Sequence, residues 1–157
     1  MNQTMPEDFR ISMMLADNAQ AVQGKLYILG AGWNFTFPGM PGAVAGIVTV
    51  PWHETNRKHV LTFSLVDDGG SAVRVGTPQG TQEPLMIRSE FEVGRPPGVR
   101  PGSSFSHPIA INYLALPLQP GRSYEWRWAI NDKTRDDWRL PFEVRQAMVQ
   151  PQPPPAT

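Results

Sequence analysis

The chain has 157 residues, with fourteen basic and fourteen acidic side chains, so its formal net charge is zero. This length suits one domain, and the neutrality removes the electrostatic reason to expect nucleic acid or an anionic membrane surface as a partner. Cysteine is absent, which excludes disulfides and thiolate chemistry.

The two ends of the chain are expected to be flexible. Residues 1–8 are polar and residues 147–157 are rich in proline, so the folded domain is predicted to span residues 9–146. The first twenty residues carry three carboxylates and lack a basic start followed by an apolar run. They therefore predict no export signal and a cytoplasmic protein.

The first strand is predicted at residues 9–15, where apolar side chains alternate with polar ones. Residues 16–23 are expected to form a short turn of helix or a loop. Residues 26–52 then carry no charge at all. Five glycines and three prolines argue against a membrane helix there, since they would leave backbone groups unsatisfied in lipid. We expect two core strands, residues 26–29 and 43–50, joined by a loop.

The second half of the chain alternates apolar and polar residues in several segments. Asp67 to Gly70 is a turn signal, residues 72–75 are expected to pair back as a short hairpin arm, and residues 76–83 to form a flexible excursion. Further strands are predicted at residues 61–65, 85–93, 109–116, 124–130 and 138–144. About eight strands at this spacing predict an all-β protein, an antiparallel β-sandwich of the immunoglobulin-like or C2-like kind.

Tyr124 lies just inside one of these strands, after the turn Pro120-Gly121. This position resembles the tyrosine corner of immunoglobulin-like sandwiches, in which the hydroxyl bonds to nearby backbone. An ordinary core tyrosine, packed through its ring alone, is the alternative interpretation.

Four motifs resemble those of a known family. They are Gly24-Lys-Leu-Tyr-Ile-Leu-Gly30 with Trp33, Val50-Pro-Trp-His-Glu-Thr-Asn-Arg57, Phe91-Glu-Val-Gly-Arg-Pro-Pro-Gly98 and Leu140-Pro-Phe142. From about Leu15 to Val144, the chain resembles an uncharacterised bacterial domain family of β-sandwich proteins. The resemblance implies the fold and carries no activity with it.

The loop at residues 52–59 and the connector at residues 95–101 hold the candidate contact residues. The loop mixes an aromatic ring, two imidazoles, a carboxylate, an amide and two cations, which suits a polar ligand that Trp52 stacks on and Arg57 grips. The structural alternative pairs Glu54 with Arg57 and uses Trp52 to close the end of the core. The connector is either a partner contact or a rigid link. The candidate ligand or partner contacts are Trp52, His53, Glu54, Asn56, Arg57, His59, Arg95 and Arg100.

Metal sites have little support in the sequence. Zinc would need His53, His59 and His107 to come together with a carboxylate, and nothing in their spacing requires this. Acidic loops at residues 67–68 and 132–137 would suit calcium only with a third loop, and turn chemistry already explains them. We therefore predict no metal and no cofactor.

Catalysis has no positive signal. The chain lacks a Gly-x-Ser-x-Gly elbow, a phosphate-cradling glycine loop and an HExxH helix. We expect a non-enzymatic protein-interaction or structural module that works through a protein partner or self-assembly, as a subunit of a larger assembly. One alternative is a small-ligand or carbohydrate-binding module that uses Trp52 and residues 53–59. A second alternative is a metal-dependent hydrolase.

Overall fold

The computed structural model describes residues 8–146 and 154–155. Apart from Asp8 and two prolines, the flexible ends predicted at residues 1–8 and 147–157 lie outside the described residues. The described chain is all-β, with one short 3₁₀ helix, η2. Its elements are β1 (Arg10–Ala16), β2 (Asn18–Val22), β3 (Lys25–Leu29), β4 (Phe35–Thr36), β5 (Gly42–Val50), η2 (Trp52–Glu54), β6 (Lys58–Asp67), β7 (Arg74–Gly76), β8 (Gln82–Pro84), β9 (Met86–Glu92), β10 (Phe105–Tyr113), β11 (Ser123–Ile130) and β12 (Arg139–Val144).

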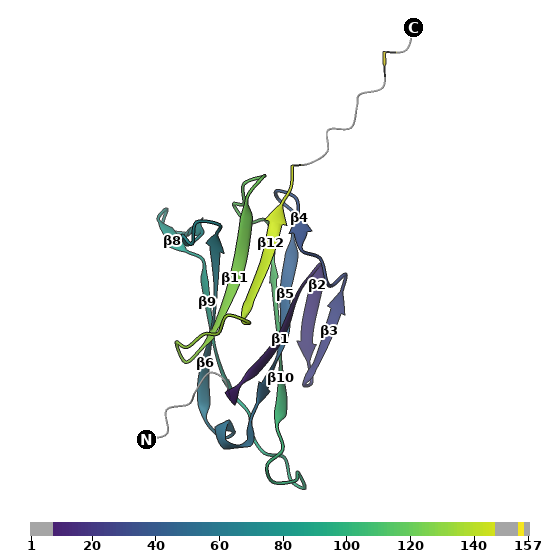
Figure 1. The fold of residues 1–157 in the computed structure, drawn as a ribbon, viewed down its shortest axis with the longest axis vertical. Coiled ribbons are helices and arrows are strands. Elements are labelled where there is room, and N and C mark those ends of the chain that lie inside the picture. Colours follow the sequence, from purple (N-terminus) through teal and green to yellow (C-terminus); the bar gives the residue numbers. More distant parts are fainter. Residues whose placement is uncertain (1–7, 147–153, 156–157) are drawn as a thin grey trace.

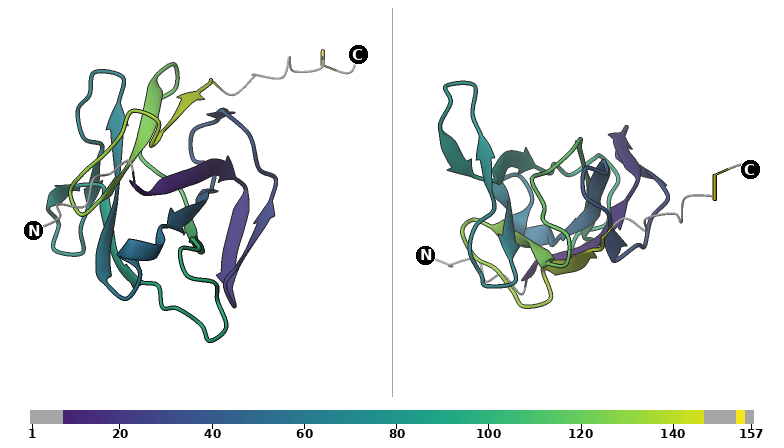
Figure 2. Two further views of the ribbon diagram at one scale, coloured as in Figure 1. Left: turned by 60° about the horizontal axis from the view of Figure 1, so that its bottom comes forward. Right: turned by 90° about the horizontal axis from the view of Figure 1, so that it is seen from above.

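Two larger sheets hold most of these strands (Figure 1). One has the order β1-β5-β10, and the other has the order β4-β12-β11-β6-β9. Neighbouring strands are antiparallel except β4 and β12, whose short pairing is parallel. The hairpins β2–β3 and β7–β8 form two small additional sheets, and Figure 2 shows the β7–β8 hairpin projecting from the body of the domain.

One hydrophobic cluster joins the two larger sheets. Period-two alternation in β11 directs Tyr124, Trp126, Trp128 and Ile130 inward, as the sequence predicts, and all four are buried. Alternate residues of β5, among them Val44 and Val48, enter the same cluster from the other sheet. The remaining buried members come from β1, β6, β9, β10, β12 and the loops beside them.

The uncharged stretch contains one central strand, and the prediction of a second is wrong. β5 lies between β1 and β10 and is buried along most of its length. β3 instead lies at the periphery, where Tyr27 is 56% and Leu29 is 70% exposed. Residues 18–22 form strand β2 rather than a helical turn or loop, because they pair with β3 in a hairpin. The absence of charge therefore predicted a buried strand correctly for β5, which has a strand on each side, and incorrectly for β3, which pairs with β2 alone.

The β2–β3 hairpin covers the outer face of the β1-β5-β10 sheet. Small residues make the contact: Ala19 packs with Ala43 and Ala45, and Leu26 and Ile28 lie against this second cluster. Asn112 of β10 fastens the hairpin, because its amide accepts a hydrogen bond from the Ala19 N–H (3.0 Å) and donates one to the Ala19 carbonyl (2.8 Å). The Asn112 side chain thus satisfies the backbone groups on the outer edge of β2 that a neighbouring strand would otherwise bind.

The turns at Asp67 and before Tyr124 form as the sequence predicts. Asp67 closes its turn by accepting hydrogen bonds from the N–H groups of Gly69 and Ser71. The arm after it bonds back only briefly, at residues 72–73, and the excursion predicted at residues 76–83 is the tip and second strand of the β7–β8 hairpin. The Tyr124 hydroxyl accepts a hydrogen bond from the Gln119 N–H at 2.9 Å, which confirms the predicted tyrosine-corner contact.

Candidate functional site

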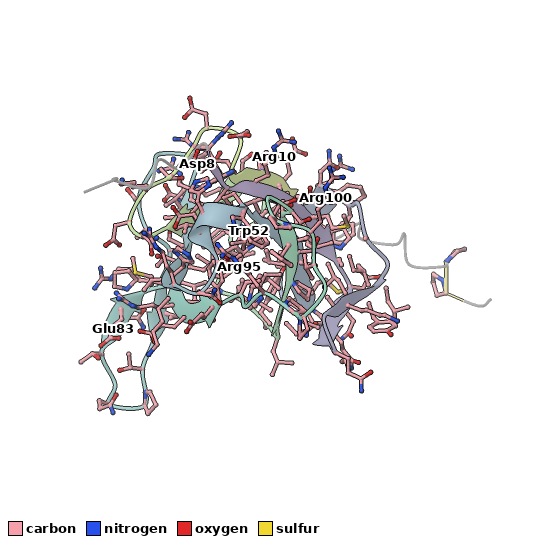
Figure 3. The ribbon with its side chains drawn as sticks, turned by 90° about the horizontal axis from the view of Figure 1, so that it is seen from below. Asp8, Arg10, Trp52, Glu83, Arg95 and Arg100 are labelled. Carbon is pink, nitrogen blue, oxygen red and sulfur yellow. The ribbon has the colours of Figure 1, made fainter. Side chains whose placement is uncertain are left out.

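Most of the candidate contact residues gather at one end of the domain, around η2 (Figure 3). Trp52 and Arg95 lie close together there, whereas Arg100 lies apart at the rim. Arg100 belongs to a separate turn, in which its carbonyl accepts a hydrogen bond from the Ser103 N–H. The loop and the connector therefore meet through Arg95 and not through Arg100.

Arg95 binds the loop from across the connector. Its Nε donates to the Thr55 hydroxyl at 2.6 Å, and its terminal nitrogen donates to the Trp52 carbonyl at 2.8 Å. The guanidinium also lies 3.8 Å from the centre of the Trp52 ring, and Phe105 stacks on the same ring at 6.2 Å. Trp52 is half-buried by these contacts, so it does not form the open aromatic platform that a carbohydrate-binding site needs.

His59 is a buried structural residue and not a surface contact, in contrast to its prediction as a ligand residue. It is 2% exposed and packs against Phe9 and Phe91 at 5.1 and 5.4 Å between ring centres. Its Nε2 lies 2.8 Å from the Glu54 carbonyl, which can only accept, so Nε2 carries the proton.

Asn131 fixes the other nitrogen of His59. The Asn131 amide oxygen accepts a hydrogen bond from the Val60 N–H at 3.0 Å, so its NH₂ faces Nδ1 of His59, also at 3.0 Å. Nδ1 must then be the acceptor, which makes the imidazole neutral and leaves neither nitrogen for a metal. Asn131 directly follows β11 and turns the chain with a left-handed φ of 51°.

Glu54 is buried as well, at 2% exposure, and lies among positive or ionisable groups. Its carboxylate is 3.7 Å from Arg57 and 3.6 Å from His59, so the ion pair with Arg57 in the structural alternative is present. His53 is exposed and lies 3.3 Å from Asp8. Asn56 is exposed and turns the chain with a left-handed φ of 58°.

Within residues 8–146, three potential metal ligands lie close together, but they are not the histidines that were considered from the sequence. The atoms of Asp8, His53 and Glu54 lie within 4.8 Å of one another. His59 is excluded by its hydrogen bonds, and His107 stacks on Phe91 at 4.8 Å. The combination of three histidines that was considered for zinc is therefore not formed.

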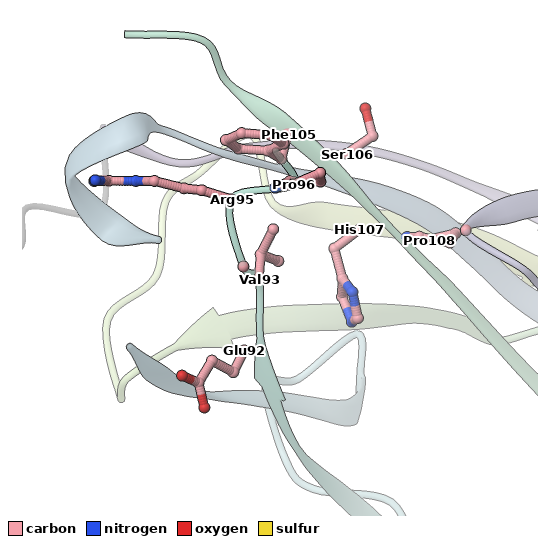
Figure 4. Close-up of a pocket in the computed structure, with 10 residues that line it drawn as sticks. Glu92, Val93, Arg95, Pro96, Phe105, Ser106, His107 and Pro108 are labelled. Carbon is pink, nitrogen blue, oxygen red and sulfur yellow. The ribbon is translucent and has the colours of Figure 1, made fainter. Parts of the chain in front are cut away.

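An open groove of about 590 Å³ runs beside the connector. Its walls come from the end of β9, the start of the connector, the start of β10 and the turn of the β2–β3 hairpin. Figure 4 shows that Arg95 extends away from His107, so the two basic groups do not converge. Glu92, Arg95, Ser106 and His107 supply the polar side chains of the groove. Arg95 was predicted as a contact and His107 was weighed as a zinc ligand, whereas Ser106 was not singled out in the sequence.

Burial lowers the pKa of His107 below its ordinary value of 6.5. At a pH between the lowered pKa of the folded state and 6.5, His107 is protonated more often in the unfolded chain than in the folded one. The contribution of the neutral imidazole to the free energy of unfolding is therefore complete above pH 6.5 and decreases as the pH falls below it. We expect His107→Gln to flatten the pH dependence of the free energy of unfolding in this range, measured by urea denaturation. An unchanged pH dependence would contradict this assignment.

Arginines pair with carboxylates in both acidic loops that were considered for calcium. Arg122 lies 2.6 Å from Asp68 and 3.3 Å from Asp67, and its hydrogen bond lowers the pKa of the Asp68 carboxyl. Arg135 donates to Asp137 at 2.8 Å and lowers the pKa of that carboxyl in the same way. In each loop, therefore, at least one carboxylate already has an arginine partner that competes with a cation for its oxygens.

A family model described as Family of unknown function (DUF6941) matches residues 11–145. A comparison with curated proteins found no match. None of the helices in the described ranges has the length and apolar character needed to cross a bilayer.

Proposed function

The chain belongs to this family of unknown function, and we propose that it is a non-enzymatic protein-interaction or structural module, one subunit of a larger cytoplasmic assembly. We propose an antiparallel β-sandwich of the immunoglobulin-like or C2-like kind as its architecture. The single hydrophobic cluster shared by the two larger sheets supports that architecture.

The contrast between the polar end of the domain and the β2–β3 hairpin carries the functional proposal. At the polar end, the hydrogen bonds and ion pairs are formed within the domain, by Arg95, His59 and Glu54. On the hairpin, by comparison, Tyr27 and Leu29 present large apolar side chains to solvent. Exposed apolar residues that adjoin one another are typical of surfaces that bind protein.

The proposal is tested by capture of proteins from an extract of the native source. We expect the wild-type chain to retain a protein that the double variant Tyr27→Ser/Leu29→Ser does not retain. The control Met86→Ser/Leu114→Ser removes two apolar residues that are 61% and 84% exposed elsewhere, and it should retain the same protein. Identical capture by all three chains would contradict a role for the hairpin face.

The groove beside the connector favours a second candidate, a small-ligand-binding module. Its volume of about 590 Å³ lies in the range of ligand sites, and it combines apolar walls with Glu92, Ser106 and His107. Thermal-shift measurements with short oligosaccharides and small organic anions test it, with Ser106→Trp as the variant that fills the groove. A metal-dependent hydrolase has less support, because His59 and His107 do not join the cluster of Asp8, His53 and Glu54.

A further inference from the structure

The outer edge of β3 presents backbone groups that no other strand pairs with. β2 and β3 form a two-stranded sheet, which ends at β3 (Figure 1). Asn112 binds both backbone groups of Ala19, so these groups point away from β3. Ala19 lies opposite Ile28, so the two residues form a non-hydrogen-bonded pair. In such a pair the N–H and C=O groups of both residues point away from the partner strand. The N–H and C=O groups of Ile28, and by alternation those of Leu26, therefore lie along the free edge.

Three other edge strands in this fold, β4, β9 and β10, carry devices that prevent strand addition. β10 contains Pro108, which lacks an N–H, and β4 is only two residues long. β9 carries the charged residues Arg88, Glu90 and Glu92. β3 has neither proline nor a run of charge, and Lys25 is its single charged residue. Its edge is thus open for pairing.

The geometry points to a second copy of this chain as the occupant: we propose that two chains pair antiparallel through β3, about a two-fold axis at Tyr27. In that register Leu26 of each copy lies opposite Ile28 of the other, and both residues have outward-pointing backbone groups. Their reciprocal hydrogen bonds extend the hairpins into one sheet of order β2-β3-β3-β2. Tyr27 meets its own equivalent in the closer, non-hydrogen-bonded type of pair.

Side chains on both faces suit the same two-fold arrangement. On the outer face, Tyr27 and Leu29 of each copy align with those of the other, and on the inner face the half-buried Leu26 and Ile28 extend the apolar contact. Charge favours the antiparallel direction. Lys25 begins β3, whereas Asp17 lies beside its end, where the Asp17 N–H donates to the Leu29 carbonyl. The two-fold axis brings each Lys25 to the Asp17 end of the other copy.

This inference rests on the proposed function and names its partner, and the two can fail separately. Self-association is measured on the purified chain by sedimentation velocity over a range of concentrations, whereas capture from an extract reports any protein that uses the hairpin face. Because five residues a side make a small interface, we expect a reversible dimer with a dissociation constant in roughly the micromolar range. A chain that stays monomeric throughout overturns the inference, even if it captures another protein.

Two matched substitutions test the register. Leu29 of one copy lies opposite Lys25 of the other, so Leu29→Lys should place like charges together and weaken the dimer at least tenfold. Leu29→Glu removes the same apolar side chain but faces Lys25 with an opposite charge, and it should dimerise clearly more tightly than Leu29→Lys. Equal dissociation constants for the two variants would overturn the proposed pairing.

The absence of cysteine in the chain allows a direct cross-linking test. Tyr27→Cys puts two thiols face to face at the axis, at a spacing that a disulfide can bridge, so oxidation should convert the variant to a covalent dimer. The control Gln20→Cys is exposed on the same face, opposite Tyr27 within the hairpin, but lies one strand away from the axis. Faster cross-linking of the Tyr27→Cys chain supports the inference, and equal rates overturn it.

Discussion

Replacing Trp128 with alanine is expected to lower the free energy of unfolding by about 3–5 kcal/mol. Its side chain is 0% exposed, lies between the two larger sheets and meets Phe63 edge-on at 4.4 Å between ring centres. Among the described residues its indole N–H has no hydrogen-bond partner, so its contribution is apolar packing. Urea denaturation measures the loss. Trp52→Ala, at the half-buried end of the domain, should cost clearly less, and an equal cost would contradict this account.

The position of the Trp128 ring also explains why Gly46 stands in the middle of β5. A Cβ at Gly46 would lie 2.7 Å from the Trp128 ring and 2.7 Å from the Ser12 carbonyl oxygen. Gly46→Ala is therefore expected to cost about 1–3 kcal/mol through overpacking. In the Trp128→Ala background one of the two clashes is gone, so the same substitution should cost less. Equal costs in both backgrounds would show that Trp128 and Gly46 are not coupled.

His59→Ala is expected to lower the free energy of unfolding by about 3 kcal/mol, because it opens a cavity and leaves the Asn131 amide and the Glu54 carbonyl without their partner. His53→Ala removes an imidazole whose side chain is 60% exposed and should change stability by less than about 0.5 kcal/mol. Thermal and urea denaturation of both variants separate the two roles. If His59→Ala folds as stably as the wild-type chain, the structural assignment of this histidine is wrong.

These variants also decide how the loop at residues 52–59 is understood. Its composition suggested a site for a polar ligand, but the structure uses His59 and Glu54 inside the domain and covers Trp52 with Arg95. Its exposed residues are His53, Asn56, Arg57 and Lys58. A loop rich in functional groups is thus explained largely by the need to connect β5 to β6 and hold the connector in place.

The sequence by itself determined the strands whose two faces differ. In β11 the alternation of Trp126 and Trp128 with charged neighbours specifies which face is buried, and the turns at Asp67 and before Tyr124 follow from local backbone preferences. These features depend on residues within a few positions of one another. The family resemblance, from about Leu15 to Val144, agrees with the match over residues 11–145.

Only the tertiary structure decided what lies beside each segment. β3 and β5 read alike in sequence, yet β5 is flanked by two strands and β3 by one, because Asn112 holds the hairpin on the outside of the sheet. Likewise, the nitrogen of His59 that accepts a hydrogen bond meets Asn131, which lies 72 positions away. Burial and hydrogen-bond partners are set by residues distant in the chain, and composition within one segment does not contain that information.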